Sequence, residues 1–281
     1  MLTSFTDLLA EHDRRGTALG AFTCYDMEVA RAVLGSAAGR GVGVVLLISR
    51  DSFSASGGDQ LLAGIRAAAE QSKARACVQL DHVSDLRLIE GAFELGAGAV
   101  MADGSKLPFD QNVELVQASQ RLASRFTGGV EAELGHVAGG EDVAEATEAG
   151  GLTDPADAAR FVELTGVALL AVSIGNVHGK YAGEPNLDWK RLGELARSLS
   201  TPLSLHGASG LADEDVRRAV GDGIRKINVN TELREAYLNA TRSSLPDALD
   251  GLRLIDLHQA QTAAVHQLVD EKIGVFTGGS R

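Results

Sequence analysis

The sequence predicts an α/β protein of the (β/α)8 class, the TIM barrel, and three observations support this prediction. Short apolar runs alternate with stretches of helical periodicity along the whole chain. Eight such pairs are found, and together they span about 250 residues, the usual size of this barrel. Polar residues follow many of the apolar runs directly, at the strand ends where such barrels carry their active sites. A doubly wound open sheet is the alternative architecture.

Each apolar run is short enough to be a buried strand, and each helical stretch is long enough to cross back over the sheet. The expected strands span residues 18–23, 43–48, 76–80, 99–102, 129–134, 168–174, 202–205 and 224–229. The expected helices span residues 27–38, 59–73, 84–95, 110–124, 154–165, 188–199, 213–220 and 232–242. Ser84, Asp154 and Asp213 are expected to cap three of these helices, with Pro155 at a first helical position.

No linker or change of composition divides the chain, so we expect a single domain over residues 1–281. Segment 135–152 is long and rich in Gly and Glu, unlike an ordinary turn between a strand and a helix. Because it follows the fifth strand, it should lie at the end of the barrel that carries active sites. We therefore expect a mobile loop that closes over the site.

The composition excludes several classes of function. Hydrophobic residues make up 44% of the 281 residues, enough for a large core. A net charge of −12 argues against nucleic acid or an anionic membrane as a partner. Cys24 and Cys77 form neither a CxxC pair nor a disulfide framework, which is typical of a reducing compartment. No stretch reaches the roughly 18 apolar residues of a membrane span, so we expect a cytoplasmic protein.

Three histidines lie directly after predicted strands or at their ends, and they suggest a metal site. His82 follows the third strand, His178 the sixth, and His206 ends the seventh. The carboxyl ends of all strands form one rim in a barrel, so these side chains should converge. Three neutral imidazoles and one open position are the typical ligand set of a catalytic zinc ion. The remaining histidines are expected to be structural: His12, His136, His258 and His266.

The same rim is expected to carry carboxylates and small residues. The carboxylates are Asp81, Asp103, Glu131 and Glu133. Gly-rich turns after the sixth and seventh strands, and an Asn-Val-Asn-Thr segment at the end of the eighth, place backbone N–H groups where a phosphate could bind. For Lys180 and Lys226 three interpretations stay open: positive charge at the site, a surface position, or an ion pair in the barrel.

Taken in order, these motifs resemble the class II fructose- and tagatose-bisphosphate aldolase family. The matching segments are LDH (80–82), DGS (103–105), VEAELG (130–135), GGED (139–142), LTDP (152–155), IGNVHGKY (174–181), LHGASG (205–210) and KINVNTEL (226–233). They cover most of the chain, so the ordered set is far more specific than any single segment. The resemblance implies a TIM-barrel lyase that reversibly cleaves a phosphorylated ketose to dihydroxyacetone phosphate and an aldehyde.

The resemblance also implies a role for each matching residue. The expected Zn²⁺ ligands are His82, His178 and His206, with Glu133 as a candidate for a second metal site. Asp81 would handle the proton of the C4 hydroxyl, and Glu141 in the long loop would exchange the proton of the donor carbon. The expected substrate-binding residues are Gly179, Gly207, Ser209, Asn228, Asn230, Thr231, Ser49 and Ser105. A monovalent cation near the phosphate is an additional cofactor that this interpretation allows.

The sequence departs from the family pattern on one side of the expected site. Thr23 stands where the family commonly has Asn, Ser49-Arg50-Asp51 replaces a Gly-containing turn, and Lys106 replaces a common His. The segments implied in binding metal and donor are retained. These departures predict an acceptor aldehyde different from that of fructose 1,6-bisphosphate cleavage; the alternative is that they are neutral changes around an ordinary sugar-bisphosphate site.

Two other functions remain open at this point. A zinc-dependent TIM-barrel hydrolase would also use three histidines and a carboxylate, to activate water. A catalytically silent relative would keep the fold as a binding protein. We expect a homodimer or homotetramer, because closed homo-oligomers are common among such enzymes.

Overall fold

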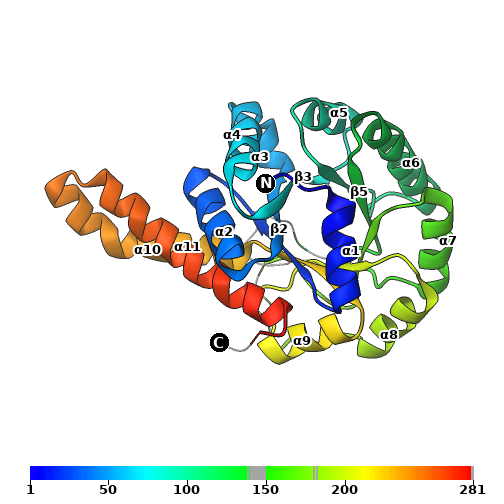
Figure 1. Cartoon of the computed structure of the whole chain (residues 1–281). Helices are drawn as coiled ribbons and strands as arrows, with labels where there is room; N and C mark the ends of the chain where they lie inside the picture. Colours follow the sequence, from blue (N-terminus) through cyan, green and yellow to red (C-terminus); the bar gives the residue numbers. More distant parts are fainter. Residues whose placement is uncertain (138, 140–149, 180, 182, 280–281) are drawn as a thin grey trace.

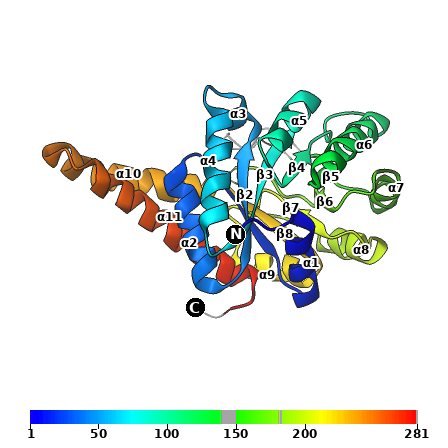
Figure 2. The same cartoon turned by 45° about the horizontal axis from the view of Figure 1, so that its top comes forward.

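The computed structural model confirms the predicted barrel. Eight parallel strands close on themselves in sequence order, from β1 beside β2 to β8 beside β1. Helices surround the barrel in Figures 1 and 2. The structure describes residues 1–137, 139, 150–179, 181 and 183–279.

The strands lie close to their predicted positions. They are β1 (Leu19–Thr23), β2 (Gly43–Ser49), β3 (Arg75–Val83), β4 (Ala99–Ala102), β5 (Gly129–Leu134), β6 (Leu169–Val172), β7 (Leu203–Leu205) and β8 (Ile224–Val229). One boundary is wrong in a way that affects the site, since Asp81 and His82 belong to β3 and do not follow it. Every residue of β1 and β2 is buried, as expected for a parallel sheet covered by helices.

The eight predicted helices are present, and the described part of the chain contains three more. The predicted ones are α2 (Met27–Arg40), α4 (Gly58–Gln71), α5 (Leu86–Glu94), α6 (Phe109–Phe126), α7 (Pro155–Thr165), α8 (Trp189–Ser198), α9 (Asp213–Gly221) and α10 (Thr231–Gly251). The additional ones are α1 (Phe5–Arg15), α3 (Arg50–Ser54) and α11 (Leu254–Phe276). The predicted end of α10 at residue 242 is wrong, because the helix continues through Pro246.

One of the three predicted helix caps is confirmed. Asp154 accepts hydrogen bonds from the N–H groups of Ala156 and Asp157, with Pro155 at the first helical position. The cap of α5 is Asp85 in place of Ser84, since the Asp85 carboxylate accepts from the Arg87 N–H. Asp213 is the first residue of α9 and not its cap, so its charge lies in the first turn of the helix.

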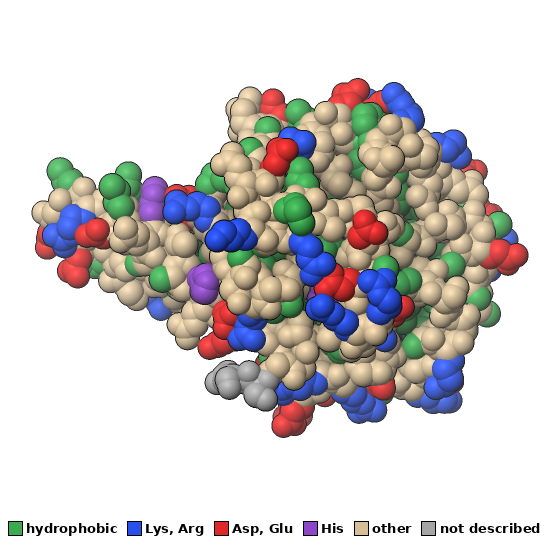
Figure 3. Space-filling view, in the orientation of Figure 1, with side chains coloured by type: hydrophobic (Ala, Val, Ile, Leu, Met, Phe, Trp, Pro, Cys, Tyr) green, Lys and Arg blue, Asp and Glu red, His purple; other side chains and the backbone are tan. Residues whose placement is uncertain are grey.

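The two ends of the chain add structure outside the barrel repeat. α1 closes the amino end of the barrel, where Phe5, Leu8 and Leu9 pack with buried residues such as Leu19 and Leu169. α10 and α11 form a hairpin that extends to the left in Figure 1, with its base against α2. Hydrophobic side chains gather at its free end in Figure 3. None of the described helices is both long and apolar enough to cross a membrane.

Candidate functional site

A distortion of β3 brings two consecutive side chains to the same end of the barrel. Adjacent residues of a regular strand point to opposite faces of the sheet. The β3–β4 register shifts between Leu80 and Val83, and His82 has the left-handed φ of 50°. This irregularity lets both Asp81 and His82 reach the polar cluster at the rim, at a backbone cost of about 1–3 kcal/mol. Such strain is typical of functional positions.

The His82 ring is oriented by a carboxylate at the end of β4. Its Nδ1 lies 2.8 Å from Asp103 Oδ2. The other oxygen, Oδ1, accepts hydrogen bonds from the Ser105 N–H and hydroxyl at 3.0 and 2.7 Å. Burial raises the pKa of Asp103, but the His82 and Ser105 hydrogen bonds outweigh it and hold that pKa well below its usual value. Asp103 is therefore an anion that accepts from His82 Nδ1, so Nε2 is the ring nitrogen that faces the other histidines.

A second carboxylate orients His206 in the same way. His206 Nε2 lies 2.9 Å from Glu131 Oε1, and both side chains are fully buried. Burial raises the pKa of Glu131, yet Lys226 and His206 together hold it well below its usual value. Burial lowers the pKa of His206 to about 4, so the ring is neutral at neutral pH. The His206 proton then lies on Nε2, and the Nδ1 lone pair is available.

The available nitrogens of these two rings face each other. His206 Nδ1 lies 3.0 Å from His82 Nε2. Zinc bound by two imidazoles at about 2.0–2.1 Å in tetrahedral geometry separates their nitrogens by roughly 3.3 Å. Two imidazole rings whose opposite nitrogens are already held by carboxylates are a donor set that suits a divalent metal. The residues present therefore fit a metal ion.

His178 completes the cluster. Ligand atoms of His82, His178 and His206 all lie within 4.8 Å of one another. A second group of possible ligands shares His82 and adds Asp103 and Glu133. Within the described residues, these two groups are the ones in which three or more potential metal ligands come together, and both lie at this rim. The structure thus brings together the four residues predicted from the sequence to bind metal: His82, His178, His206 and Glu133.

Glu133 lies near the end of β5 and contacts the first residues that follow this strand. Burial, reinforced by the Asp103 carboxylate, raises its pKa to about 7. Its Oε1 accepts from the Val137 N–H at 3.1 Å, and Oε2 lies 3.8 Å from His206 Nδ1. The loop ends are joined by paired backbone hydrogen bonds between His136 and Gly151. Glu141, like Lys180, lies outside the described residues.

Six of the predicted substrate-binding residues line one small pocket beside the histidines. The lining residues are His178, Gly179, Gly207, Ser209, Asn228, Asn230 and Thr231. Gly207 has a φ of +61°, and a Cβ there would lie 2.1 Å from the Val177 carbonyl oxygen, so the turn requires glycine. Asn230 precedes α10 without capping it through its side chain, and its Oδ1 instead accepts from the Tyr25 hydroxyl at 2.8 Å. The start of α10, at Asn230 and Thr231, therefore borders the pocket.

The other two predicted substrate residues make internal hydrogen bonds. Ser105 donates to Asp103, and Ser49 caps α3 by accepting from the Ser52 N–H at 3.2 Å. Arg50 is exposed and its Nε donates to Asp51 at 2.9 Å, while Lys106 is also exposed. Thr23 is buried at the end of β1, and its hydroxyl lacks a hydrogen-bond partner among the described residues.

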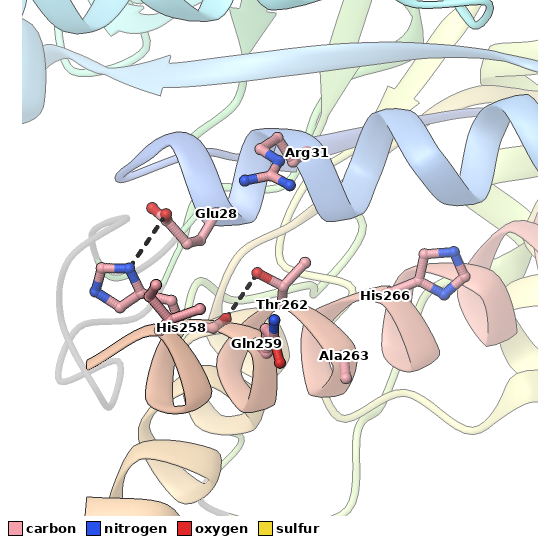
Figure 4. Close-up of a pocket in the computed structure, with 8 residues that line it drawn as sticks. Glu28, Arg31, His258, Gln259, Thr262, Ala263 and His266 are labelled. Carbon is pink, nitrogen blue, oxygen red and sulfur yellow. Dashed lines mark hydrogen bonds and ion pairs between the residues drawn. The ribbon is translucent and has the colours of Figure 1, made fainter. Parts of the chain in front are cut away.

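A groove between α2 and α11 also contains histidines, but it lacks a comparable cluster. Figure 4 shows His258 and His266 on α11, with His258 Nδ1 3.5 Å from the Glu28 carboxylate. His258 is about half exposed, and neither histidine belongs to a group of three possible ligands within the described residues. The assignment of His258 and His266 to non-catalytic positions is consistent with this geometry.

Lys226 and Gln79 lie in a buried layer of polar side chains. The sequence motifs leave the role of Lys226 open and do not include Gln79. Lys226 Nζ lies 2.8 Å from Glu131 Oε2, and Gln79 Nε2 donates to the same oxygen at 2.7 Å. Of the interpretations left open for Lys226, the structure supports the ion pair in the barrel, because the side chain is fully buried. A signal was present: Gln79 and Asp81, and likewise Glu131 and Glu133, stand two residues apart in apolar strands and so share the inner face.

Comparison with known proteins agrees with this geometry. Residues 3–280 match the sequence model of a family described as fructose-bisphosphate aldolase class-II. The chain belongs to this family. Class II aldolases are generally metal-dependent, and the histidine cluster supplies a set of side chains that fits such a metal.

Solved aldolases share the fold over nearly the whole chain. The YdjI aldolase from Escherichia coli K12 has a TM-score of 0.87 and 28% identity, over 98% of this chain and 97% of that one. A putative fructose-1,6-biphosphate aldolase from Coccidioides immitis has a TM-score of 0.89 and 25% identity, over 97% and 95% of the two chains. Fructose-bisphosphate aldolase from Campylobacter jejuni shares the fold at 18% identity, with a TM-score of 0.82 over 98% and 95%.

Proposed function

We propose that this protein is a zinc-dependent aldolase that reversibly cleaves a phosphorylated ketose to dihydroxyacetone phosphate and an aldehyde. The observation that carries the proposal is the convergence of His82, His178 and His206 next to a pocket lined by backbone-rich turns. A metal cluster alone would also suit a hydrolase. The adjoining pocket distinguishes the two, because an aldolase must hold the phosphate of its donor at a fixed distance from the metal.

In this proposal the three histidines hold the zinc ion, and Glu133 is a candidate ligand for a second position. When bound, the ion supplies the positive charge that stabilises the negative charge developing on the ketone oxygen during cleavage. The Asp103 and Glu131 carboxylates hold His82 and His206 each in one ring orientation, by accepting from one nitrogen of each ring. No lysine Schiff base is then required for the reaction.

The donor phosphate is proposed to bind in the small pocket. The N-terminus of α10 borders this pocket, and the helix dipole favours an anion at this position. Gly179 and Gly207 allow close approach of the backbone, and Ser209 and Thr231 contribute hydroxyl groups. This local positive potential explains how a chain of net charge −12 could bind a phosphate.

Proton transfer is assigned to two carboxylates. Asp81 accepts the C4 hydroxyl proton as the carbon–carbon bond breaks, and it is held by Asn228 Nδ2 at 3.2 Å. Glu141 is proposed to return a proton to the donor carbon from the long loop. Glu141→Ala should slow hydrogen exchange at that carbon. Normal exchange in the variant would transfer the role to another carboxylate, with Glu133 as the first candidate.

The acceptor aldehyde is proposed to differ from glyceraldehyde 3-phosphate. Thr23 provides a short hydroxyl at the end of β1, and Arg50 and Lys106 place positive charge at exposed positions. A homodimer or homotetramer remains a prediction, supported by the exposed Leu252 and Ile255 at the free end of the α10–α11 hairpin. Light scattering of the purified protein would test it.

The deciding experiment uses the zinc-loaded protein with dihydroxyacetone phosphate and a panel of aldehydes. We expect efficient condensation with at least one aldehyde, and kcat/KM for fructose or tagatose 1,6-bisphosphate below about 10⁴ M⁻¹s⁻¹. A higher value for either bisphosphate would refute the divergent acceptor but not the aldolase. Zinc-dependent ester or amide hydrolysis without any condensation would favour the hydrolase, and an intact metal site without turnover would favour a silent relative.

A further inference from the structure

Lys226 is the only lysine or arginine with a fully buried side chain among the described ion pairs, and the proposed chemistry gives it no contact with substrate. It lies at the centre of one chain of hydrogen bonds. We propose that Lys226 is a positioning residue that orients both the metal-ligand candidate His206 and the acid–base candidate Asp81. This inference rests on the proposed function for the roles of those two residues.

The first branch of the chain runs from Lys226 to His206. Lys226 Nζ lies 2.8 Å from Glu131 Oε2, and Gln79 Nε2 donates to that oxygen as well. The remaining oxygen, Oε1, is left to accept from His206 Nε2 at 2.9 Å. Because an ionised carboxylate can only accept, the His206 proton must lie on Nε2. Lys226 thereby keeps Nδ1 available on the side that faces His82.

The second branch runs from Lys226 to Asp81 through an amide. Lys226 Nζ donates to Asn228 Oδ1 at 2.6 Å, and Asn228 Nδ2 donates to Asp81 Oδ2 at 3.2 Å. An ammonium group has no acceptor, so it must face the oxygen of the amide. The NH₂ group is then turned toward Asp81. Without Lys226, Asn228 Oδ1 would lose its charged donor, and the Asp81 carboxylate would lose the anchor behind its own amide partner.

Stability alone gives a weak reason for a lysine at this position. Replacing a buried ion pair by apolar side chains of similar volume is often neutral or stabilising, because both charges must be desolvated. In this barrel the cation instead anchors Glu131 and Asn228, the two side chains that hold His206 and Asp81. Both branches end in the cluster at the rim, one directly after β7 and the other on β3.

The test compares Lys226→Met with the double variant Glu131→Gln/Lys226→Met, which removes both charges and so avoids an unpaired buried carboxylate. The readouts on the apoprotein are zinc affinity and the His206 ring tautomer, measured by ¹⁵N NMR. We expect both variants to bind zinc about 10- to 100-fold more weakly, the range for lost partners of metal ligands, and to show mixed tautomers. In turnover assays, kcat should fall more than KM.

A matched control removes another cation that is paired with a carboxylate outside the barrel. Arg40→Met breaks the pair with Asp270 and should leave zinc affinity and the tautomer unchanged. If the double variant binds zinc as the wild type does, with a single His206 tautomer, Lys226 only balances a buried charge and the inference is overturned. If Lys226→Met alone fails to fold, the double variant decides. Failure of the wild type to turn over any ketose would refute the aldolase while leaving these apoprotein measurements intact.

Discussion

The two ends of the barrel interior use the same alternating strand positions but differ in their chemistry. At the amino end the inner residues are apolar and pack against α1. They include Leu19, Ala21, Val45, Leu47, Cys77, Ala99 and Leu169. At the carboxyl end the corresponding positions are polar or ionised. They include Gln79, Asp81, Glu131, Glu133, His206, Lys226 and Asn228.

This difference separates stability from function within a single barrel. The apolar end contributes burial, at roughly 25 cal/mol per Å² of apolar surface removed from water. The polar end holds buried charges, which cost folding free energy unless each is paired and hydrogen-bonded. Substitutions at the apolar end should therefore change the free energy of unfolding, and substitutions at the polar end should mainly change metal binding and turnover.

Removal of the metal should have the largest effect on activity. Exhaustive chelation is expected to reduce retro-aldol turnover to background, because the positive charge that stabilises the developing negative charge on the ketone oxygen is lost. Zinc or cobalt should restore it, at about one ion per chain, as metal analysis would show. His258→Ala is the control and should keep full metal content, since His258 lies outside the cluster. Activity that persists without metal would contradict the class II mechanism.

Phe5→Ala should have the largest effect on stability. Phe5 is 1% exposed and packs in the apolar cluster between α1 and the barrel. The expected loss in the free energy of unfolding is about 3–5 kcal/mol, measured by urea denaturation. Zinc content and kcat of the folded protein should stay unchanged. A large fall in kcat at unchanged stability would show that the two ends of the barrel are not separable.

Asp81→Asn should separate proton transfer from metal binding at the polar end. The variant keeps the size of the side chain but removes the base, so kcat for cleavage should fall at least about 10²-fold. Zinc affinity and thermal stability should stay near wild type, because Asp81 does not belong to the proposed set of metal ligands. If zinc affinity falls as much as kcat does, Asp81 acts by orienting a ligand and the acid–base role is wrong.

His12 makes the amino end sensitive to pH. Burial lowers its pKa to about 4, below the ordinary value of 6.5. As the pH falls, His12 therefore becomes protonated in the unfolded chain at a higher pH than in the folded protein. Its contribution to stability is complete above pH 6.5 and is lost as the pH falls toward 4. The difference in unfolding free energy between wild type and His12→Gln should shrink across this window by up to about 3 kcal/mol. If the difference in unfolding free energy between wild type and His12→Gln stays constant from pH 6.5 to 4, the lowered pKa of His12 is contradicted.

The strain at His82 should give the smallest effect. Glycine adopts a φ of 50° without steric cost, whereas alanine does not. The free energy of unfolding of His82→Gly should therefore exceed that of His82→Ala by about 1 kcal/mol. In a regular strand the alanine variant would be the more stable of the two. Both variants should lose zinc equally. An alanine variant more stable than the glycine variant would show that the β3 irregularity relaxes when the ring is removed.

Local patterns in the sequence were sufficient for the barrel and for much of the candidate site. The alternation of short apolar runs with helical stretches located all eight strands, because burial on both faces leaves a continuous apolar signal. The position of His82, His178 and His206 at strand ends predicted that they would meet, since parallel strands in a barrel end on one rim. α11 was missed, although Gln261, Val265 and Val269 form a buried stripe at helical spacing from which it could have been predicted.

The sequence by itself determined which residues are present at the rim and that they converge. Only the tertiary structure decided how each one is oriented: the irregularity that turns His82 toward His206, the choice of Glu131 and Asp103 as ring partners, and the buried position of Lys226. These features depend on contacts between strands far apart in the chain, such as β5 with β7 and β8 across the barrel interior. Periodicity shows which face a side chain occupies, but hydrogen-bond partners depend on distances of a few ångströms that only the closed barrel fixes.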